Sequence, residues 1–344
     1  ETRNAAMLPK LYPRILVAAL FALPAIGAMA AEAPSIASLY TDHCAQCHGA
    51  DRLGAMGPAL LPENLGRLKR DEALGVIRDG RTATQMPAFR DKLSEEQIKQ
   101  LAELIYTPLA QVPRWDVEQM RASQVLHVKP GEKLADKPVF KVKDPLNLFI
   151  VVELGDHHAT LLDGDRFEAI KRFPTRFALH GGPKYSPDGR YVYFASRDGW
   201  VSKFDIYNLK YIAEIRAGIN TRNLAVSGDG RYAIAANYLP QNLVILDAET
   251  LAPVKVIDAG SRVSAVYTAP PRNSFIAAMK DLQEVWEIPY DRPGFPLRKI
   301  PTQDYLDDFF FDQDYTRLIG ASRDGKTGQV LDLAGGQHNG RLPR

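Results

Sequence analysis

The spacing of apolar residues changes once along this chain and divides it into a helical part and a strand-rich part. From about residue 35 to residue 109, apolar residues recur at every third or fourth position, which predicts amphipathic helices. The clearest stripe of this kind comprises Ile98, Leu101, Leu104 and Ile105. From about Leu146 onward, short stretches alternate between apolar and polar residues, and this period of two predicts β-strands.

Local signals locate individual helices within this pattern. The tetrapeptide Ser-Glu-Glu-Gln matches a capping box, with Ser94 as the N-cap and Gln97 at the third helical position. A second helix is predicted at Arg70–Arg78 and a short third helix near Trp115–Ser123. The third helix lies in residues 111–145, which three prolines interrupt, so we expect this segment to be a linker.

The strand-rich part repeats itself with a period near 42 residues. Tyr185–Phe194 returns as Val226–Ala235, with their Asp-Gly-Arg turns 41 residues apart, and Val201–Asp205 returns 42 residues later as Leu243–Asp247. Weaker copies follow, and a degenerate copy precedes them. Short strands and Asp-Gly turns at this period predict the four-stranded blades of a β-propeller. A β-sandwich with accidental internal similarity is the alternative.

About 200 residues follow Leu146, which is enough for about five blades. A propeller ring must close so that its terminal blades lose their free edges. The last apolar stretch, Gln329–Leu333, has the pattern of a mid-propeller strand, and a polar stub follows it. We therefore expect a mixed fold: a small all-α domain at 32–110, then an incomplete propeller at 146–344 that is C-terminally truncated from a larger, eight-bladed ring.

The N-terminus has the features of a secretory signal. Two basic residues precede an apolar run from Ile15 to Ala31, and Ala-Met-Ala at its end has the small-x-small form of a cleavage site. We expect residues 1–31 to be a signal peptide that directs the chain to the periplasm, with the residues before Met7 extraneous. The run of about 17 residues is short for a membrane span, which needs roughly 20, but an uncleaved anchor is the alternative.

The two cysteines of the chain, Cys44 and Cys47, stand in the motif Cys-x-x-Cys-His with His48. This is the attachment motif of a c-type haem: two thiols form thioethers to the haem vinyl groups, and the histidine brings its imidazole under the iron. A thioredoxin-like motif would precede a βαβ pattern, and none follows here. A zinc site would need two further ligands at short spacing, and His43 is the one additional candidate nearby.

A methionine is expected as the second axial ligand of this haem c. Met86 stands 38 residues after His48, and a His/Met pair is a usual axial set of cytochromes c. Met56, eight residues after His48 and beside a Gly-Pro turn, is the competing candidate. A covalent haem c with this ligation makes the small all-α domain at 32–110 a cytochrome c domain, and it indicates electron transfer in an oxidising compartment.

Charge adds one exclusion to this interpretation. The net charge is +2, and the Lys and Arg residues are dispersed along the chain without a basic block. The sequence therefore gives no indication of nucleic-acid binding.

The order of these parts resembles the haem c/haem d1 proteins of denitrifying bacteria. Arg176–His180 followed by Tyr185–Arg190 is similar to the family segment whose histidine is the proximal ligand of haem d1. Further similar segments are Arg197–Gly199, Asn220–Asn223, Asn237–Pro240 and Ser261–Val263. The resemblance implies a non-covalent site for haem d1 or dihydro-haem d1 in the propeller.

The resemblance also assigns roles to single residues of this pocket. His180 is implied as an axial ligand of the iron, and Tyr238 as a hydrogen-bond donor to the macrocycle rim. Haem d1 carries several carboxylates, which guanidinium groups neutralise and orient through paired hydrogen bonds. The implied arginines are Arg176, Arg197, Arg222 and Arg262. A surface or inter-blade salt bridge is the alternative for each of them.

Two kinds of family member carry both haems. Nitrite reductases reduce nitrite to nitric oxide with the help of two distal histidines, and the dehydrogenase of haem d1 biosynthesis oxidises dihydro-haem d1 by introducing an acrylate double bond. The segment corresponding to the first distal histidine is Tyr305–Asp308 here, with Asp307 in its place. A carboxylate repels nitrite and is a poor proton donor near neutral pH. The second distal position would fall beyond Arg344.

The resemblance therefore implies the dehydrogenase type, with electrons passed to haem c. A divergent nitrite reductase and a non-enzymatic haem d1-binding electron-transfer protein are the alternatives. The implied partners are a haem d1 precursor as substrate, a periplasmic electron-transfer protein as acceptor or donor, and a nitrite reductase that receives haem d1. Asp307 is the candidate catalytic residue.

Overall fold

A computed structural model describes residues 34–111, 113–129, 131–321, 327–335 and 338–343. The expected signal peptide, residues 1–31, lies outside the described residues. Among the residues described, none of the helices is long and apolar enough to cross a membrane. Contacts between Cα atoms group Ser35–Arg344 into one compact unit.

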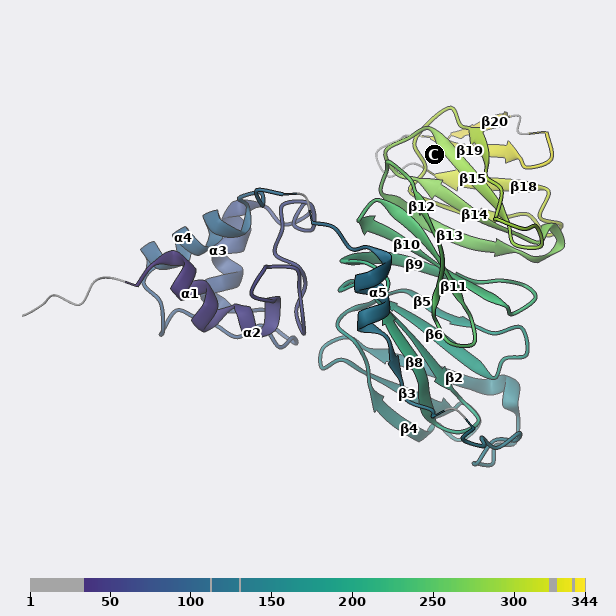
Figure 1. Cartoon of the computed structure of the whole chain (residues 1–344), viewed down its shortest axis with the longest axis horizontal. Helices are drawn as coiled ribbons and strands as arrows, with labels where there is room; N and C mark the ends of the chain where they lie inside the picture. Colours follow the sequence, from purple (N-terminus) through teal and green to yellow (C-terminus); the bar gives the residue numbers. More distant parts are fainter. Residues whose placement is uncertain (1–33, 112, 130, 322–326, 336–337, 344) are drawn as a thin grey trace, which may run out of the picture. The chain divides into compact units, whose positions relative to one another are not determined.

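The N-terminal part of this unit is helical, as the apolar spacing predicts (Figure 1). Its helices are α1 (Ile36–His43), α2 (Ala45–His48), α3 (Arg70–Asp79) and α4 (Glu95–Ile105). Ile98 and Leu101 of α4 are buried against Leu39 and Ile77 of α1 and α3. The capping box is confirmed: the Gln97 N–H donates to Ser94 Oγ (3.2 Å), and the Ser94 N–H donates to Gln97 Oε1 (2.8 Å).

The strand-rich part forms five antiparallel sheets in the described residues. The first sheet consists of β2 (Leu148–Glu153), β3 (His158–Asp163) and β4 (Glu168–Pro174). The second sheet consists of β5 (Leu179–Tyr185), β6 (Tyr191–Ser196), β7 (Trp200–Asp205), β8 (Lys210–Arg216) and β1 (Val125–Leu126), and the third of β9 (Asn220–Val226), β10 (Tyr232–Leu239), β11 (Asn242–Asp247) and β12 (Pro253–Asp258). The fourth sheet consists of β13 (Val263–Ala269), β14 (Ser274–Met279), β15 (Glu284–Pro289) and β16 (Arg298–Pro301), and the fifth of β17 (Asp308–Phe311), β18 (Arg317–Ala321), β19 (Thr327–Asp332) and β20 (His338–Pro343).

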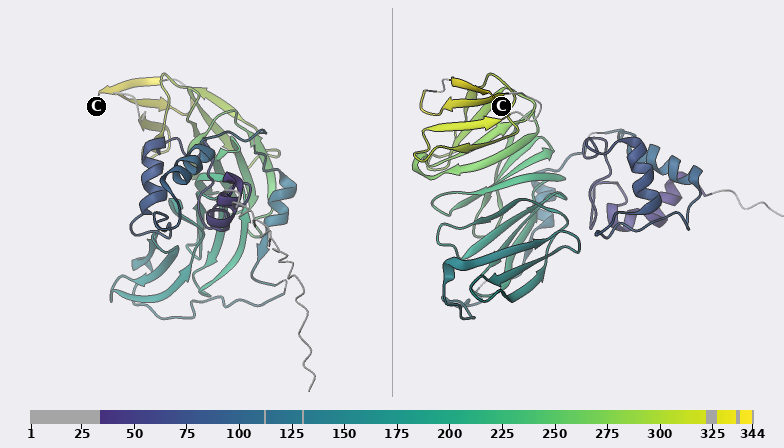
Figure 2. Two further views of the ribbon diagram at one scale, coloured as in Figure 1. Left: turned by 90° about the vertical axis from the view of Figure 1, so that its left-hand side faces the viewer. Right: turned by 180° about the vertical axis from the view of Figure 1, so that it is seen from behind.

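Within each sheet the strands from β2 onward follow one another in chain order, and in Figures 1 and 2 the colours pass from teal to yellow across successive sheets. The first strands of neighbouring sheets, β5, β9, β13 and β17, contact one another. A β-sandwich has two sheets, so five sheets in succession exclude that alternative. The repeat read from the sequence thus corresponds to one sheet per period.

Hydrogen bonds between neighbouring sheets keep this repeat in register. Thr268 Oγ1 donates to the Val226 carbonyl (2.6 Å), and Ser264 Oγ donates to the Leu306 carbonyl (3.2 Å). In each pair the two residues are 42 positions apart in the chain. Equivalent positions of successive repeats therefore lie next to each other in space.

The described residues of the segment 111–145, expected to be a linker, include several that pack against the sheets. Helix α5 (Val117–Ser123) confirms the predicted short helix, and β1 extends the second sheet beyond β8. Met120 of α5 is fully buried between residues of the second and third sheets. The Trp115 indole N–H donates to the Arg216 carbonyl (2.7 Å), and the Arg216 N–H donates to Ser123 Oγ (2.9 Å). The prolines interrupt the helical pattern, but this packing still orders the segment.

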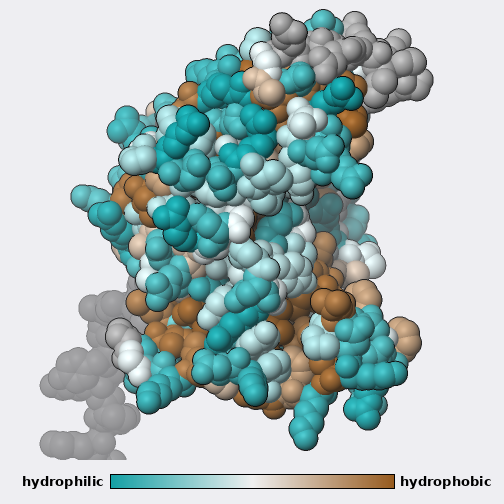
Figure 3. Space-filling model, turned by 90° about the vertical axis from the view of Figure 1, so that its right-hand side faces the viewer, coloured by the Kyte–Doolittle hydropathy of each residue, from teal (hydrophilic) through white to brown (hydrophobic). Residues whose placement is uncertain are grey.

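The first sheet differs from the others because it has three strands and its strand β2 pairs with β3 alone among the described residues. Phe149 and Val151 of β2 remain 51% and 44% exposed. Figure 3 shows a face of the molecule on which apolar residues gather toward the lower end, whereas the upper part is mostly polar. The first sheet therefore has a free edge next to exposed apolar side chains.

The packing of α5 on the sheets gives a testable prediction. Met120→Ala should lower the free energy of unfolding by about 2–5 kcal/mol, because it leaves a cavity at a fully buried position. Glu118→Ala, an exposed position on the same helix, should change it by less than about 0.5 kcal/mol. Urea denaturation followed by tryptophan fluorescence measures both. Equal effects of the two substitutions would mean that α5 does not pack on the sheets.

Candidate functional site

The Cys-x-x-Cys-His motif lies where α1 passes into α2. Cys44 is both the C-cap of α1 and the N-cap of α2, and the Cys47 N–H donates to the Cys44 carbonyl (3.1 Å), so one turn separates two free thiols. Burial raises the pKa of the Cys44 thiol to about 11. A thioredoxin-like redox motif needs a lowered thiol pKa, so this environment disfavours that alternative.

His48 is the last residue of α2 and is 8% exposed. Burial lowers the pKa of its imidazole, and Nδ1 lies 2.8 Å from the Pro58 carbonyl oxygen. A carbonyl oxygen can only accept, so Nδ1 carries the proton and the Nε2 lone pair is free to bind a metal. A Cβ atom on Gly57 would come within 2.9 Å of the ring, so glycine is needed for the backbone to pass so close.

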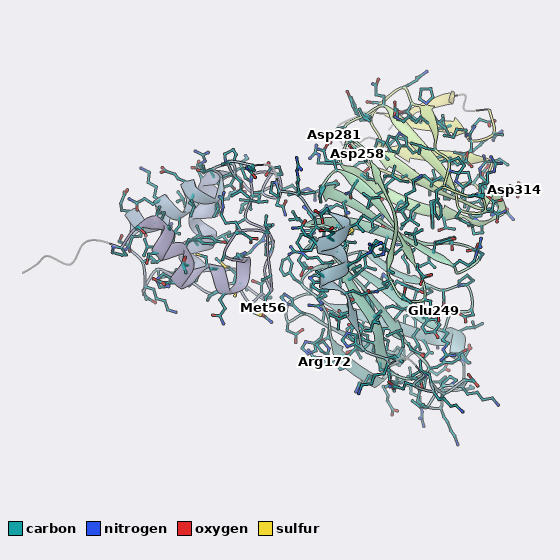
Figure 4. All side chains as sticks on the ribbon, viewed as in Figure 1. Met56, Arg172, Glu249, Asp258, Asp281 and Asp314 are labelled. Carbon is teal, nitrogen blue, oxygen red and sulfur yellow. The ribbon has the colours of Figure 1, made fainter. Side chains whose placement is uncertain are left out.

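The two candidate methionines have different environments. Met86 packs against the apolar cluster of the helical part, to which Cys44 and Phe89 also belong. Met56 is 52% exposed and lies in the loop after α2, where Figure 4 labels it. In the described part of the chain, no three His, Cys, Asp or Glu side chains come together as a metal-ion cluster would require. The geometry therefore favours Met86 and gives no support to a zinc site.

His180 begins the second candidate site, at the start of β5. Its Nδ1 lies 2.6 Å from the carbonyl oxygen of Arg222, which is 42 residues further along the chain at the start of β9. Burial, and next the nearby Arg222 charge, lower the pKa of His180 to about 4. The imidazole is therefore neutral near pH 7, with Nδ1 as donor and Nε2 free as a metal ligand. A cavity of about 250 Å³ beside it is lined by residues of β2, β5 and β6, including Val152, Gly181 and Phe194.

Arg197 and Arg222 are cations without a carboxylate partner among the described residues. Arg222 is only 9% exposed, burial lowers its pKa, and its Nε atom is buried without any hydrogen bond. Partial burial and the Arg222 charge lower the pKa of Arg197. A buried, uncompensated guanidinium is unfavourable on its own. Buried Arg222 and the exposed Arg197, together with a free imidazole nitrogen, fit an anionic ligand that contains a metal.

The other two predicted arginines are already paired. Arg176 donates to both carboxylate oxygens of Glu214 (2.9 Å each) and lies 3.7 Å above the Trp200 ring. Arg262 donates to Asp281, which Figure 4 labels, with contacts of 2.9 and 2.5 Å. These are the salt bridges that the sequence left open as the alternative, and they satisfy the guanidinium groups without a ligand.

Tyr238 lies among cations at the end of β10. The guanidinium carbons of Arg222 and Arg262 are 4.7 and 5.5 Å from its ring centroid, and Lys280 Nζ is 5.9 Å away. Asp307, directly before β17, forms an ion pair with the Lys280 ammonium group. The structure thus brings His180, Arg222, Tyr238 and Asp307 to the same end of their sheets, at the starts of first strands or the ends of second strands.

Lys280 was missed at the sequence level, although the repeat contains the signal for it. Three residues recur at equivalent positions of successive sheets: Arg197 directly follows β6, Tyr238 lies at the end of β10, and Lys280 directly follows β14. The distances between them along the chain are 41 and 42 residues. Each lies at the end of the second strand of its sheet or directly after it. Extending the alignment of repeats by one copy would therefore have identified Lys280.

Comparison with known proteins gives the same division of the chain. The family described as cytochrome D1 heme domain matches residues 143–339, and the one described as cytochrome C oxidase, cbb3-type, subunit III matches residues 31–105. Dihydro-heme d1 dehydrogenase of Pseudomonas aeruginosa is 54% identical over 338 residues, which cover 96% of this chain and 68% of that protein. Nitrite reductase of Stutzerimonas stutzeri is 29% identical over 292 residues, 78% of this chain and 50% of that protein.

A solved structure extends the similarity to the fold. The structure of dihydro-heme d1 dehydrogenase NirN in complex with DHE superposes with a TM-score of 0.82, over 89% of this chain and 67% of that one, at 54% identity. The matched family covers more than half of the chain, including the strands from β2 to β19. The chain therefore belongs to the cytochrome D1 heme domain family.

Proposed function

We propose that this protein is a haem c/haem d1 oxidoreductase that oxidises dihydro-haem d1 to haem d1. One observation carries the proposal: a neutral imidazole with a free Nε2 atom, His180, lies beside Arg222, a buried guanidinium that forms no ion pair with a carboxylate of the described residues. An iron tetrapyrrole with several carboxylates satisfies both groups at once. The relative that is 54% identical is named for this dehydrogenation.

Haem c would be attached through Cys44 and Cys47, with His48 and Met86 as the axial pair. Both cysteines are free, and the His48 ring is fixed by its bond to the Pro58 carbonyl. When bound, this group supplies a one-electron acceptor. The residues around the haem c site orient the His48 imidazole, and the apolar cluster against which Met86 packs lies on the side of that methionine.

In the second site, His180 would bind the substrate iron through Nε2, while Arg197 and Arg222 bind substrate carboxylates. Tyr238 would contact the macrocycle rim from its position beside Arg222. Arg176 and Arg262 instead hold Glu214 and Asp281, so their part is to fix the walls of the site. The ion pairs support this assignment of different roles to the four arginines, because Arg176 and Arg262 already have a carboxylate partner and need no anion from a ligand.

We further propose that the five sheets are blades of a larger propeller ring. The 42-residue register, the contacts between successive first strands and the free edge of β2 support this proposal. The first strands would then line the central channel, and their starting residues would surround a ligand at one end of it.

Two features favour dehydrogenation over nitrite reduction. Asp307 replaces the distal histidine of nitrite reductases, and its side chain forms an ion pair with Lys280. A carboxylate repels nitrite and cannot donate a proton. We place the reaction in the periplasm, where the electrons would leave haem c for an electron-transfer protein and the product haem d1 would pass to a nitrite reductase.

The haem c assignment is tested by exchanging the two methionines. Met86→Ala should leave the haem attached but lower its reduction potential and abolish the sulfur-to-iron charge-transfer band at the red end of the spectrum. Met56→Ala should keep both the band and the potential, because its side chain is half exposed. If Met56→Ala loses the band and Met86→Ala keeps it, the ligand assignment is wrong.

The tetrapyrrole site is tested by removing one unpaired and one paired arginine. Arg222→Ala should weaken haem d1 binding by about 1.5–3 kcal/mol, roughly 10- to 150-fold in the dissociation constant. Arg176→Ala should leave this constant unchanged and lower the stability of the protein, because the buried Glu214 carboxylate then loses its guanidinium partner and keeps only Ser202 and His127. His180→Ala should shift the haem d1 spectrum and leave the haem c bands unchanged. Equal haem d1 affinity in wild type, His180→Ala and Arg222→Ala would exclude this site.

The activity is tested directly with dihydro-haem d1 and an external electron acceptor. The protein should convert dihydro-haem d1 to haem d1 and reduce nitrite only slowly, and Asp307→His should raise any residual nitrite reduction, because an imidazole can deliver a proton. Visible absorption follows the first reaction, and nitric oxide release follows the second. Rapid nitrite reduction without conversion of dihydro-haem d1 would overturn the proposal. Binding without either reaction would indicate a carrier.

A further inference from the structure

One ion pair at this end of the sheets serves neither iron site. Lys280, in the turn between β14 and β15, pairs with Asp307 from the fifth sheet, and their side chains are 16% and 27% exposed. Both groups are shielded from bulk water, yet neither is closed off from a ligand. A carboxylate and an ammonium group from neighbouring sheets thus lie beside the residues that would hold the substrate.

Cations from the third and fourth sheets surround Asp307. Besides Lys280, the charges of Arg222 in β9 and of Arg262 directly before β13 interact with it. The other carboxylate nearby, Asp281, accepts hydrogen bonds from the Arg262 side chain and from the Arg262 backbone N–H. Among the described residues, Lys280 is the side-chain partner that the structure gives Asp307. Asp307 is therefore the less engaged of the two carboxylates.

The reaction of the proposed function, on which this inference rests, needs a base. A propionate side chain, –CH₂–CH₂–COO⁻, becomes an acrylate, –CH=CH–COO⁻: two C–H bonds break, one C=C bond forms, and two protons and two electrons leave. The electrons leave in succession through haem c to a one-electron acceptor protein. His180 has its free nitrogen directed at the iron in this proposal, and Asp281 is engaged, so neither is available to accept a proton.

We propose that Asp307 is the proton acceptor of this dehydrogenation and that Lys280 is a positioning residue that orients the Asp307 carboxylate. One proton passes from a substrate carbon to the Asp307 carboxylate, which becomes a carboxylic acid, and the second proton passes to water. Lys280 acts through Asp307, since its ammonium group fixes one carboxylate oxygen and leaves the other for the substrate.

Asp307→Asn separates this role from binding because it keeps the shape and removes the base. The site binds an anion, so loss of a negative charge should leave the dissociation constant for dihydro-haem d1 unchanged or lower it. The single-turnover rate of the haem c-loaded protein should fall at least about 100-fold. Visible titration measures the first quantity and rapid mixing the second. Asp307→Ser gives an independent test, because added formate should restore part of its rate as a diffusible base.

Lys280 is tested by rescue and by a double variant. Lys280→Met should slow turnover, Lys280→Arg should restore most of the rate, and Lys280→Met combined with Asp307→Asn should be no slower than Asp307→Asn alone. Lys299→Met is the matched control: this lysine also lies over an aromatic ring, 4.6 Å from the Trp286 centroid, but on β16. It should leave the rate and the affinity unchanged.

The possible results separate this inference from the proposed function. If the wild-type protein and the Asp307→Asn variant convert dihydro-haem d1 equally fast, the inference about Asp307 is overturned and the proposed function stands. Binding weakened more than tenfold in Asp307→Asn makes Asp307 a structural residue of the wall and also overturns it. A wild-type protein that binds dihydro-haem d1 but never converts it contradicts the proposed function, and the role of Asp307 as a base falls with it.

Discussion

The strand-rich part is organised by a repeat of 42 residues, whose successive copies lie side by side in register. The hydrogen bond from the His180 imidazole to the Arg222 carbonyl, 42 residues further along the chain, depends on this register. Because the first strands of successive sheets contact one another, equivalent positions meet at one end of the sheets. The same contact fixes the tautomer of His180 and the backbone of Arg222. A shift of one residue between sheets would separate the imidazole from its acceptor and turn neighbouring side chains to the opposite face.

Charge then distinguishes the walls of the site from its binding groups. Arg176, Arg262 and Lys280 each have a carboxylate partner, whereas Arg197 and Arg222 have none among the described residues. A buried guanidinium without a counter-charge costs free energy in the ligand-free protein, which an anionic ligand recovers on binding. The site is therefore arranged for a ligand that brings its own negative charge and a metal for His180.

The sequence predicts what depends on local or periodic signals. The capping box at Ser94, the helix near Met120 and the repeat all follow from residues close together or one period apart. The partners of the arginines do not, because Glu214 lies 38 residues from Arg176 and Asp281 lies 19 residues from Arg262. The residues next to an arginine in the sequence therefore do not indicate whether its guanidinium group forms an ion pair with a carboxylate. The packing of the supposed linker was also missed, since it depends on surfaces that exist only after the sheets form.

The most direct test of this account is the structure of the protein with dihydro-haem d1 bound. The account predicts the iron on His180 Nε2, ligand carboxylates on Arg197 and Arg222, and Arg176 still paired with Glu214. Iron bound by another residue, or carboxylates held by Arg176 while Arg222 stays without a partner, would contradict it.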